Sequence, residues 1–164
     1  MTALTYVAIA IVLGGTALLL LLPIIIGGAA PSFPIASTDH ISSWSWAGIY
    51  ADGGDKQNQT KAEIERLKAM VGKPAASTYD LYVGIASDYE LLGDGKSSYS
   101  YLNRAIAQDP KRALAYMNMG RLMEDLGAFA TAHAAYDKAV ALEPTNPLYQ
   151  AALQNFLVHH SGTN

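Results

Sequence analysis

The chain has 164 residues, of which 15% are charged, and this length suffices for one domain with an accessory segment. From Lys56 onward the basic and acidic residues cancel, so the formal net charge of -3 comes from Asp39, Asp52 and Asp55. This balance, without a basic stripe, argues against nucleic-acid binding, and the absence of cysteine excludes disulfides, thiolate metal sites and a cysteine nucleophile.

The amino-terminal segment is apolar, and Met1 to Thr38 contains no Asp, Glu, Lys or Arg. A helix made from its uncharged run, residues 7–28, spans roughly 30 Å of hydrocarbon. A cleavable signal peptide and a buried core helix are the alternatives, but no Lys or Arg precedes the run as in a signal peptide. We therefore expect residues 1–28 to be a transmembrane anchor that contacts the lipid bilayer through residues 7–28.

The orientation of this expected single-pass anchor depends on the charges that flank it. Neither flank offers the Lys or Arg on which the positive-inside rule depends. The free amino group before the run, against the three aspartates after it, favours a cytoplasmic amino terminus. The domain that follows is then expected on the extracytoplasmic side.

Residues 29–59 are rich in Pro, Gly, Ser and Ala, a composition that predicts a flexible linker. Trp44, Trp46, Ile49 and Tyr50 interrupt it. These side chains either lie at the level of the lipid headgroups, as aromatics near membrane spans do, or pack on the domain that follows. The position close to the apolar run favours the headgroups.

A capping helix is predicted over residues 60–73. Thr60 and Glu63 have the spacing of a capping box, and Ile64 and Leu67 continue a helical period. Gly72 and the proline after it end the pattern.

Residues 113–146 repeat the pattern of residues 79–112 with a period of about 34 residues. The matching positions are Pro144 with Pro110, Ala139 with Ala105, Tyr136 with Leu102, Gly127 with Gly93, Met123 with Tyr89, Gly120 with Ala86, Met119 with Ile85 and Tyr116 with Tyr82. This pattern resembles the tetratricopeptide repeat family. The resemblance implies a domain over residues 79–164, with two helix pairs, 79–112 and 113–146, and a final helix, 147–159.

The repeated pattern places small residues where neighbouring helices must approach closely. Gly120 and Ala132 are expected where the two helices of one unit cross, and Ala139 where the next unit packs, since larger side chains would push the axes beyond about 8–10 Å. Gly127 permits the turn between the helices, and Pro144 ends the second one. Ser98 departs from the family pattern, which has Ala at that position.

The sequence offers no catalytic pattern. It has no glycine-rich phosphate loop, serine elbow or zinc-helix motif. His159 and His160 are adjacent, so on a helix their side chains point about 100° apart, and no third ligand is evident. We expect no catalytic residue, no metal site and no cofactor, and we predict that the protein is not an enzyme.

The resemblance implies a concave groove, lined by the first helix of each unit, that accepts a protein partner or an extended peptide. Carried over by position, its lining is Asp80, Val83, Ser87, Glu90, Leu91, Leu114, Met117, Asn118, Arg121, Glu124, Asp125, Leu148, Ala151 and Asn155. Chaperone-binding members hold a terminal carboxylate with Lys, Asn and Arg, and Asn118 alone matches that set. Arg121 either contacts the partner or forms an exposed pair with Asp125 four residues on.

The sequence thus predicts an all-α chain in which an amino-terminal transmembrane helix precedes a short helical-repeat domain like that of the tetratricopeptide family. The function that follows is a membrane-anchored protein–protein interaction module that scaffolds or assists the assembly of envelope or membrane protein complexes. The alternative is a structural accessory subunit of a larger membrane complex, with Gly14, Gly15 and Pro23 packed against other spans.

Overall fold

The computed structural model describes residues 5–13, 16–24 and 32–160 of the chain. It divides into two compact units, Met1–Pro31 and Ser32–Asn164.

The amino-terminal unit contains two strands, β1 (Thr5–Leu13) and β2 (Thr16–Ile24). They pair antiparallel, with Leu13 opposite Thr16 and Thr5 opposite Ile24. The expected transmembrane helix is therefore wrong over both ranges, while Gly14, Gly15 and residues 25–28 lie outside the described residues. Two aliphatic runs separated by Gly-Gly also match a hairpin signature, which the length and hydropathy of residues 7–28 did not reveal. Within the described ranges, no helix combines the length and apolar character needed to cross a bilayer.

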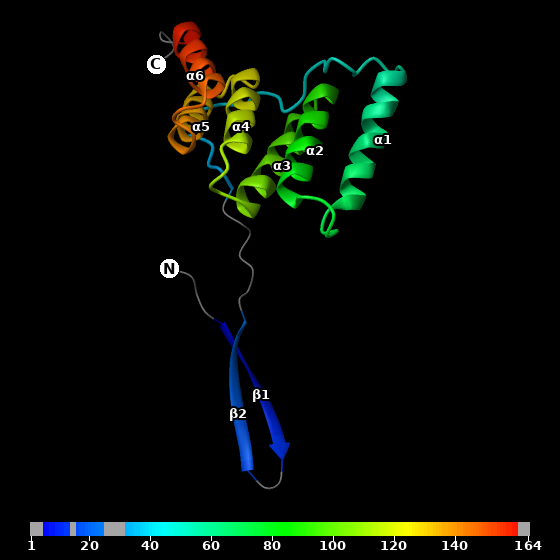
Figure 1. Ribbon diagram of the computed structural model, residues 1–164, viewed down its shortest axis with the longest axis vertical. Helices are drawn as coiled ribbons and strands as arrows, with labels where there is room; N and C mark the ends of the chain where they lie inside the picture. Colours follow the sequence, from blue (N-terminus) through cyan, green and yellow to red (C-terminus); the bar gives the residue numbers. More distant parts are fainter. Residues whose placement is uncertain (1–4, 14–15, 25–31, 161–164) are drawn as a thin grey trace. The chain divides into compact units, whose positions relative to one another are not determined.

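The second unit is helical. Figure 1 shows its helices side by side in chain order. They are α1 (Asp55–Met70), α2 (Thr78–Leu92), α3 (Gly95–Gln108), α4 (Leu114–Asp125), α5 (Phe129–Leu142) and α6 (Pro147–His160). The pairs α2–α3 and α4–α5 fall within the two predicted repeat units, and α6 is the predicted final helix.

Helix α1 begins earlier than the predicted capping helix. The Thr60 hydroxyl donates to the Lys56 carbonyl at 2.8 Å, and the Glu63 carboxylate pairs with Arg66 at 2.6 Å, so neither side chain caps a helix start. Asp55 lies in the first turn, where a carboxylate is stabilised by the positive end of the helix dipole. The predicted capping box was therefore wrong: the helix begins at Asp55, and the side chains of Thr60 and Glu63 have partners within it.

The turns inside the two units are equivalent. Gly93 follows α2 with φ 77°, and Gly127 lies between α4 and α5 with φ 73°. A side chain is strained in this left-handed region, so glycine is required at both turns. The spacing of these glycines is the part of the repeat pattern that fixes the reversal of each helix pair.

The core lies between the paired helices, where Ile85, Leu102, Met119, Leu122 and Met123 are fully buried. Gly120 is also buried, and a Cβ there would lie 2.6 Å from the Tyr136 ring. The nearest neighbour of Gly120 across this crossing is thus the Tyr136 ring on α5, and Ala132 of the same helix is also buried. Ser98 is buried as well, and its hydroxyl donates to the Glu90 carboxylate at 3.2 Å.

Candidate functional site

The segment before α1, residues 32–54 and here called the strap, is bound to the helical array. In Figure 1 it crosses the array towards the start of α1. Near its beginning, the Tyr99 hydroxyl on α3 donates to the Phe33 carbonyl at 2.7 Å. The Phe33 ring also meets the Tyr116 ring edge-on, with centroids 5.8 Å apart. The predicted flexible linker over 29–59 is therefore wrong from residue 32 onward, while residues 29–31 lie outside the described residues.

Asp39 of the strap caps helix α5. The residue before that helix, Ala128, has no side-chain acceptor, whereas α2 and α3 are capped by Ser77 and Asp94. The Asp39 carboxylate supplies the missing acceptor, because the backbone N–H groups of Ala130 and Thr131 donate to it at 3.1 and 2.7 Å. A carboxylate at this end of a helix satisfies unpaired donors and is favoured by the helix dipole.

The two tryptophans of the strap lie on the turn between α2 and α3. The Trp46 N–H donates to the Gly93 carbonyl at 3.1 Å, and the Gly95 N–H donates to the Trp44 carbonyl at 2.9 Å. The Trp44 ring lies 5.3 Å from the Tyr99 ring. For Trp44 and Trp46 the alternative, packing on the following domain, therefore holds in place of the preferred headgroup seating, whereas Ile49 is 79% exposed. A Cβ on Gly93 would lie 2.1 Å from the Trp46 carbonyl oxygen, so the backbones approach closely here.

The predicted groove residues are divided between core and surface. Val83 and Asn118 are 7% and 8% exposed, so little of either residue reaches the surface. Ser87, Glu90, Met117 and Glu124 are half-buried, whereas Leu114, Arg121, Asp125 and Asn155 are exposed. The burial of Val83 and Asn118 was not foreseen, because the family position gives the helix face but not how closely the neighbouring unit packs on it.

Arg121 bridges the two repeat units. Its guanidinium meets the Glu90 carboxylate of α2 at 2.7 Å, whereas the sequence offered Asp125 of its own helix as the partner. Burial raises the pKa of Glu90, and the charge and hydrogen bond of Arg121 oppose that rise. Because Glu90 is also bonded to Ser98, a buried polar residue of α3, three helices meet at this carboxylate.

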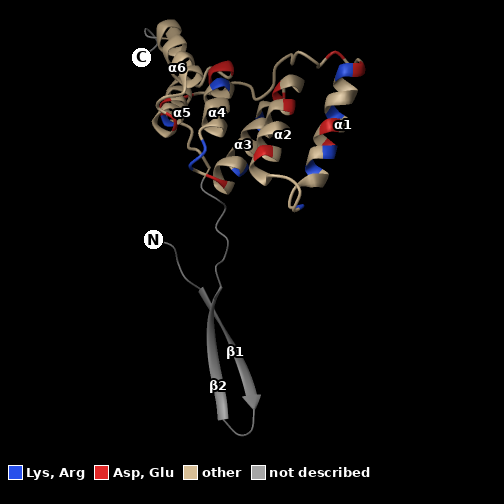
Figure 2. Cartoon of the chain, viewed as in Figure 1, with Lys and Arg blue, Asp and Glu red and all other residues tan. Residues whose placement is uncertain are grey.

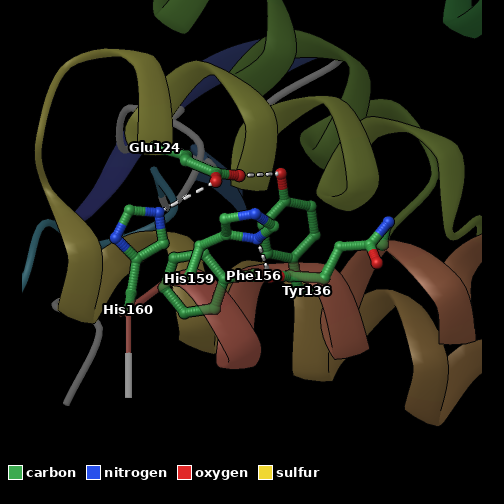
Figure 3. Close-up of a pocket in the computed structure, with 7 residues that line it drawn as sticks. Glu124, Tyr136, Phe156, His159 and His160 are labelled. Carbon is green, nitrogen blue, oxygen red and sulfur yellow. Dashed lines mark hydrogen bonds and ion pairs between the residues drawn. The ribbon is translucent and has the colours of Figure 1, made fainter. Parts of the chain in front are cut away.

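A pocket of about 490 Å³ lies beyond this bridge, lined by side chains of α4, α5 and α6. Figure 3 shows the Glu124 carboxylate between the Tyr136 hydroxyl, which donates to it at 2.8 Å, and the His160 ring at 3.0 Å. Burial raises the pKa of Tyr136, and its bond to Glu124 raises it further. Phe156 is buried beside them and forms an apolar wall.

The two adjacent histidines have different surroundings, as their spacing predicted. His159 contacts the Asn155 carbonyl oxygen at 2.7 Å, while the His160 ring stacks on Phe129 with centroids 4.2 Å apart. Over residues 32–160, His, Asp and Glu side chains form no group of three suited to a metal ion.

Sequence reasoning missed the strap contacts and the pocket on α6. Asp39 was noted only for its charge, and the one available signal was that α5 has no capping side chain of its own. Phe156 lies one period after Leu122, a fully buried core residue, so its burial was accessible from the period, but the His160 contact was not.

Part of the helical array is similar to a known protein family. No curated protein matches the chain. Residues 91–156 match the family model described as tetratricopeptide repeat. This stretch begins at the end of α2 and includes all of α3, α4 and α5 and most of α6. The match supports the resemblance predicted from the sequence.

Proposed function

We propose that the face formed by α2, α4 and α6 binds a protein partner. Tetratricopeptide repeats generally mediate protein–protein interaction, and residues 91–156 match that family. The strap contacts α3, α5, the turn after α2 and, through Phe33, Tyr116 of α4. Leu114 of α4 and Leu148 of α6 remain exposed to a partner.

The observation that carries this proposal is a set of exposed apolar side chains on α4 and α6, with Leu114 and Leu148 one repeat period apart. Leu148 and Val158 of α6 are 74% and 64% exposed, and Leu114 of α4 is 37% exposed. Leu148, Asn155 and Val158 share one helix face by their spacing, as do Leu114 and Arg121. Exposed apolar side chains gathered on one face and bordered by polar ones are typical of contact surfaces.

Site-specific photo-crosslinking tests this proposal. A benzophenone amino acid is introduced into the full chain at Leu114 or Leu148, and at Arg104 of α3 or Ala141 of α5 as controls; all four positions are exposed. We expect the same adduct from Leu114 and Leu148 and none from the controls. Adducts formed equally from Arg104 and Ala141 would contradict the proposed face.

We also propose that the amino-terminal segment associates with a lipid bilayer and holds the helical domain on the extracytoplasmic side. The support is the uncharged sequence from Met1 to Thr38, which favours apolar surroundings. Fractionation of cells with a carbonate wash, followed by protease treatment of intact spheroplasts, tests both parts. Chain released by carbonate would contradict the first part, and a helical domain protected from protease would contradict the second.

A further inference from the structure

The carboxyl-terminal ends of α2 and α4 carry more acidic than basic side chains. Glu90 lies near the end of α2, Glu124 and Asp125 lie at the end of α4, and neither helix has a basic residue in its last turn. Figure 2 shows the acidic residues at the end of α4. The carboxyl end of a helix is the negative end of its dipole, so carboxylates there oppose helix stability.

These acidic groups lie within electrostatic range of one another. Burial raises the pKa of Asp125, an effect that Arg121 opposes and Glu124 increases. Burial also raises the pKa of Glu90, and the charge of Asp125 increases that pKa further. Arg121 is already held by Glu90 at 2.7 Å, so its positive charge offsets one of the three carboxylates. Glu124 and Asp125 remain as the surplus of negative charge.

The pocket beside Glu124 combines this charge with apolar walls. Ala152 and Phe156 line it together with the Tyr136 ring, and the Glu124 carboxylate is held by the Tyr136 hydroxyl and His160 (Figure 3). Its volume of about 490 Å³ is within the range of pockets that hold small ligands, so one long side chain fits. An ionised carboxylate offers about four acceptor sites, so two hydrogen bonds leave it able to accept more.

We infer that this pocket receives an arginine or lysine side chain from a basic segment of the partner, with its cation on Glu124 of the pocket wall and its aliphatic stem on Phe156, while Asp125, next in the chain, adds negative charge at the rim. The inference rests on the proposed function, since it names the chemistry of the partner that the α2–α4–α6 face binds. An acidic segment would meet like charge at Glu124 and Asp125. A basic one gains charge-assisted hydrogen bonds, and arginine can bond a carboxylate through two N–H groups at once.

The test uses the full chain, immobilised in mild detergent, and three degenerate peptide pools of about twelve residues. The pools are identical except for two central positions, which hold arginine, its neutral isostere citrulline, or glutamate. We expect the arginine pool to be retained roughly tenfold more than the citrulline pool, the scale of one charge-assisted hydrogen bond. The preference should weaken as salt rises, because screening reduces attraction between exposed charges.

Matched variants identify which carboxylates cause the preference for the arginine pool. Glu124→Gln and Asp125→Asn each should reduce the arginine preference several-fold, and the double variant should abolish it. Asp137 is exposed on α5, so Asp137→Asn removes the same charge elsewhere and should leave the arginine preference unchanged. Asp125 is exposed, so its variant reports on binding even where Glu124→Gln disturbs the Tyr136 bond.

Three outcomes overturn the inference. Equal retention of the arginine and citrulline pools would remove the role of charge, and so would retention of no pool. An arginine preference that survives the double variant would locate the basic site elsewhere. If the crosslinks from Leu114 and Leu148 persist while the peptide test fails, the proposed protein-binding face stands and only the basic chemistry of the partner is contradicted. If those crosslinks are absent as well, the proposed function itself is contradicted.

Discussion

The carboxylate of Asp39 and the backbone N–H of Thr131 are 2.7 Å apart, although 92 residues of chain separate them. The Thr131 hydroxyl donates to the same carboxylate and accepts a bond from the Ala36 N–H at 2.9 Å. Thr131 is buried, so the strap satisfies a polar group of the interior as well as a helix end. The strap is therefore a structural part of the repeat domain.

The first prediction concerns this cap. Asp39→Ala should lower the free energy of unfolding by about 1–2 kcal/mol, because α5 loses its capping acceptor and Thr131 loses a partner. Chemical denaturation of the full chain measures it. Asp52→Ala removes an exposed carboxylate elsewhere in the strap and should change stability by less than about 0.5 kcal/mol. Equal effects of the two variants would mean that Asp39 caps nothing.

The second prediction concerns the crossing of α4 and α5. Gly120→Ala should lower the free energy of unfolding by about 1–3 kcal/mol, because the added Cβ would lie 2.6 Å from the Tyr136 ring. Gly84→Ala is the matched control in α2, where a Cβ meets only Leu67 at 3.4 Å. Alanine favours a helix interior, so that variant should gain up to about 1 kcal/mol. Thermal unfolding that ranks the two variants the other way would contradict the packing at Gly120.

A third prediction concerns the strap aromatics. Trp44→Ala should cost about 2 kcal/mol, since the half-buried ring loses its contact with Tyr99 and the apolar surface around it. Ile49 is 79% exposed, so Ile49→Ala should have almost no effect. Tryptophan fluorescence during denaturation separates the strap from the helices, which circular dichroism follows. If Trp44→Ala unfolds at the wild-type denaturant concentration, the ring does not support the domain.

The fourth prediction is a pH dependence centred on Asp88. Burial raises the pKa of Asp88, and the charge of Glu63 raises it further. A carboxyl whose pKa is higher in the folded than in the unfolded state binds more protons when folded, so its ionisation lowers stability as pH rises through the folded pKa. Asp88→Asn should therefore stabilise the domain at neutral pH, by a few tenths of a kcal/mol because the group is partly exposed.

The pH profile distinguishes this effect from a general benefit of the amide. The advantage of Asp88→Asn should shrink as pH falls through the folded pKa and disappear below about 3, where the wild-type carboxyl is protonated in both states. Asp137→Asn on α5 serves as the exposed control. A stability gain for Asp88→Asn that is constant from neutral to acid pH would exclude the electrostatic cause.

The helical half of the fold was predictable because its determinants are periodic. Gly93 and Gly127 occupy equivalent turns, and the small residue Gly120 occupies a tight crossing, so one repeat unit identifies the next. What the period did not give is the identity of each neighbour. Gly120 faces Tyr136, and Arg121 reaches Glu90 of the preceding unit, because such contacts depend on how the units stack.

The strap and the amino-terminal strands were not predictable by the same means. Proline, glycine and serine in the strap indicate irregular backbone, but they do not distinguish a loose segment from one bound to a surface. Its attachment depends on single side chains such as Asp39 and Trp44, whose partners are distant in sequence. In the amino-terminal segment, length and hydropathy suit a spanning helix, while Gly-Gly between two aliphatic runs suits a hairpin; composition alone does not decide between them.

The strap also imposes an order on how the chain is made. Asp39 is synthesised 92 residues before Thr131, which at about 5–20 residues per second is a delay of about 5–18 seconds. During that interval α2, α3 and α4 can pair, since their contacts are close in sequence and form quickly. The strap is thus translated before the helices and finishes docking only after α5 has emerged. Until then Asp39 lacks its donors on α5, and the contacts of Trp44 and Trp46 with the turn after α2 are those that can already hold the strap.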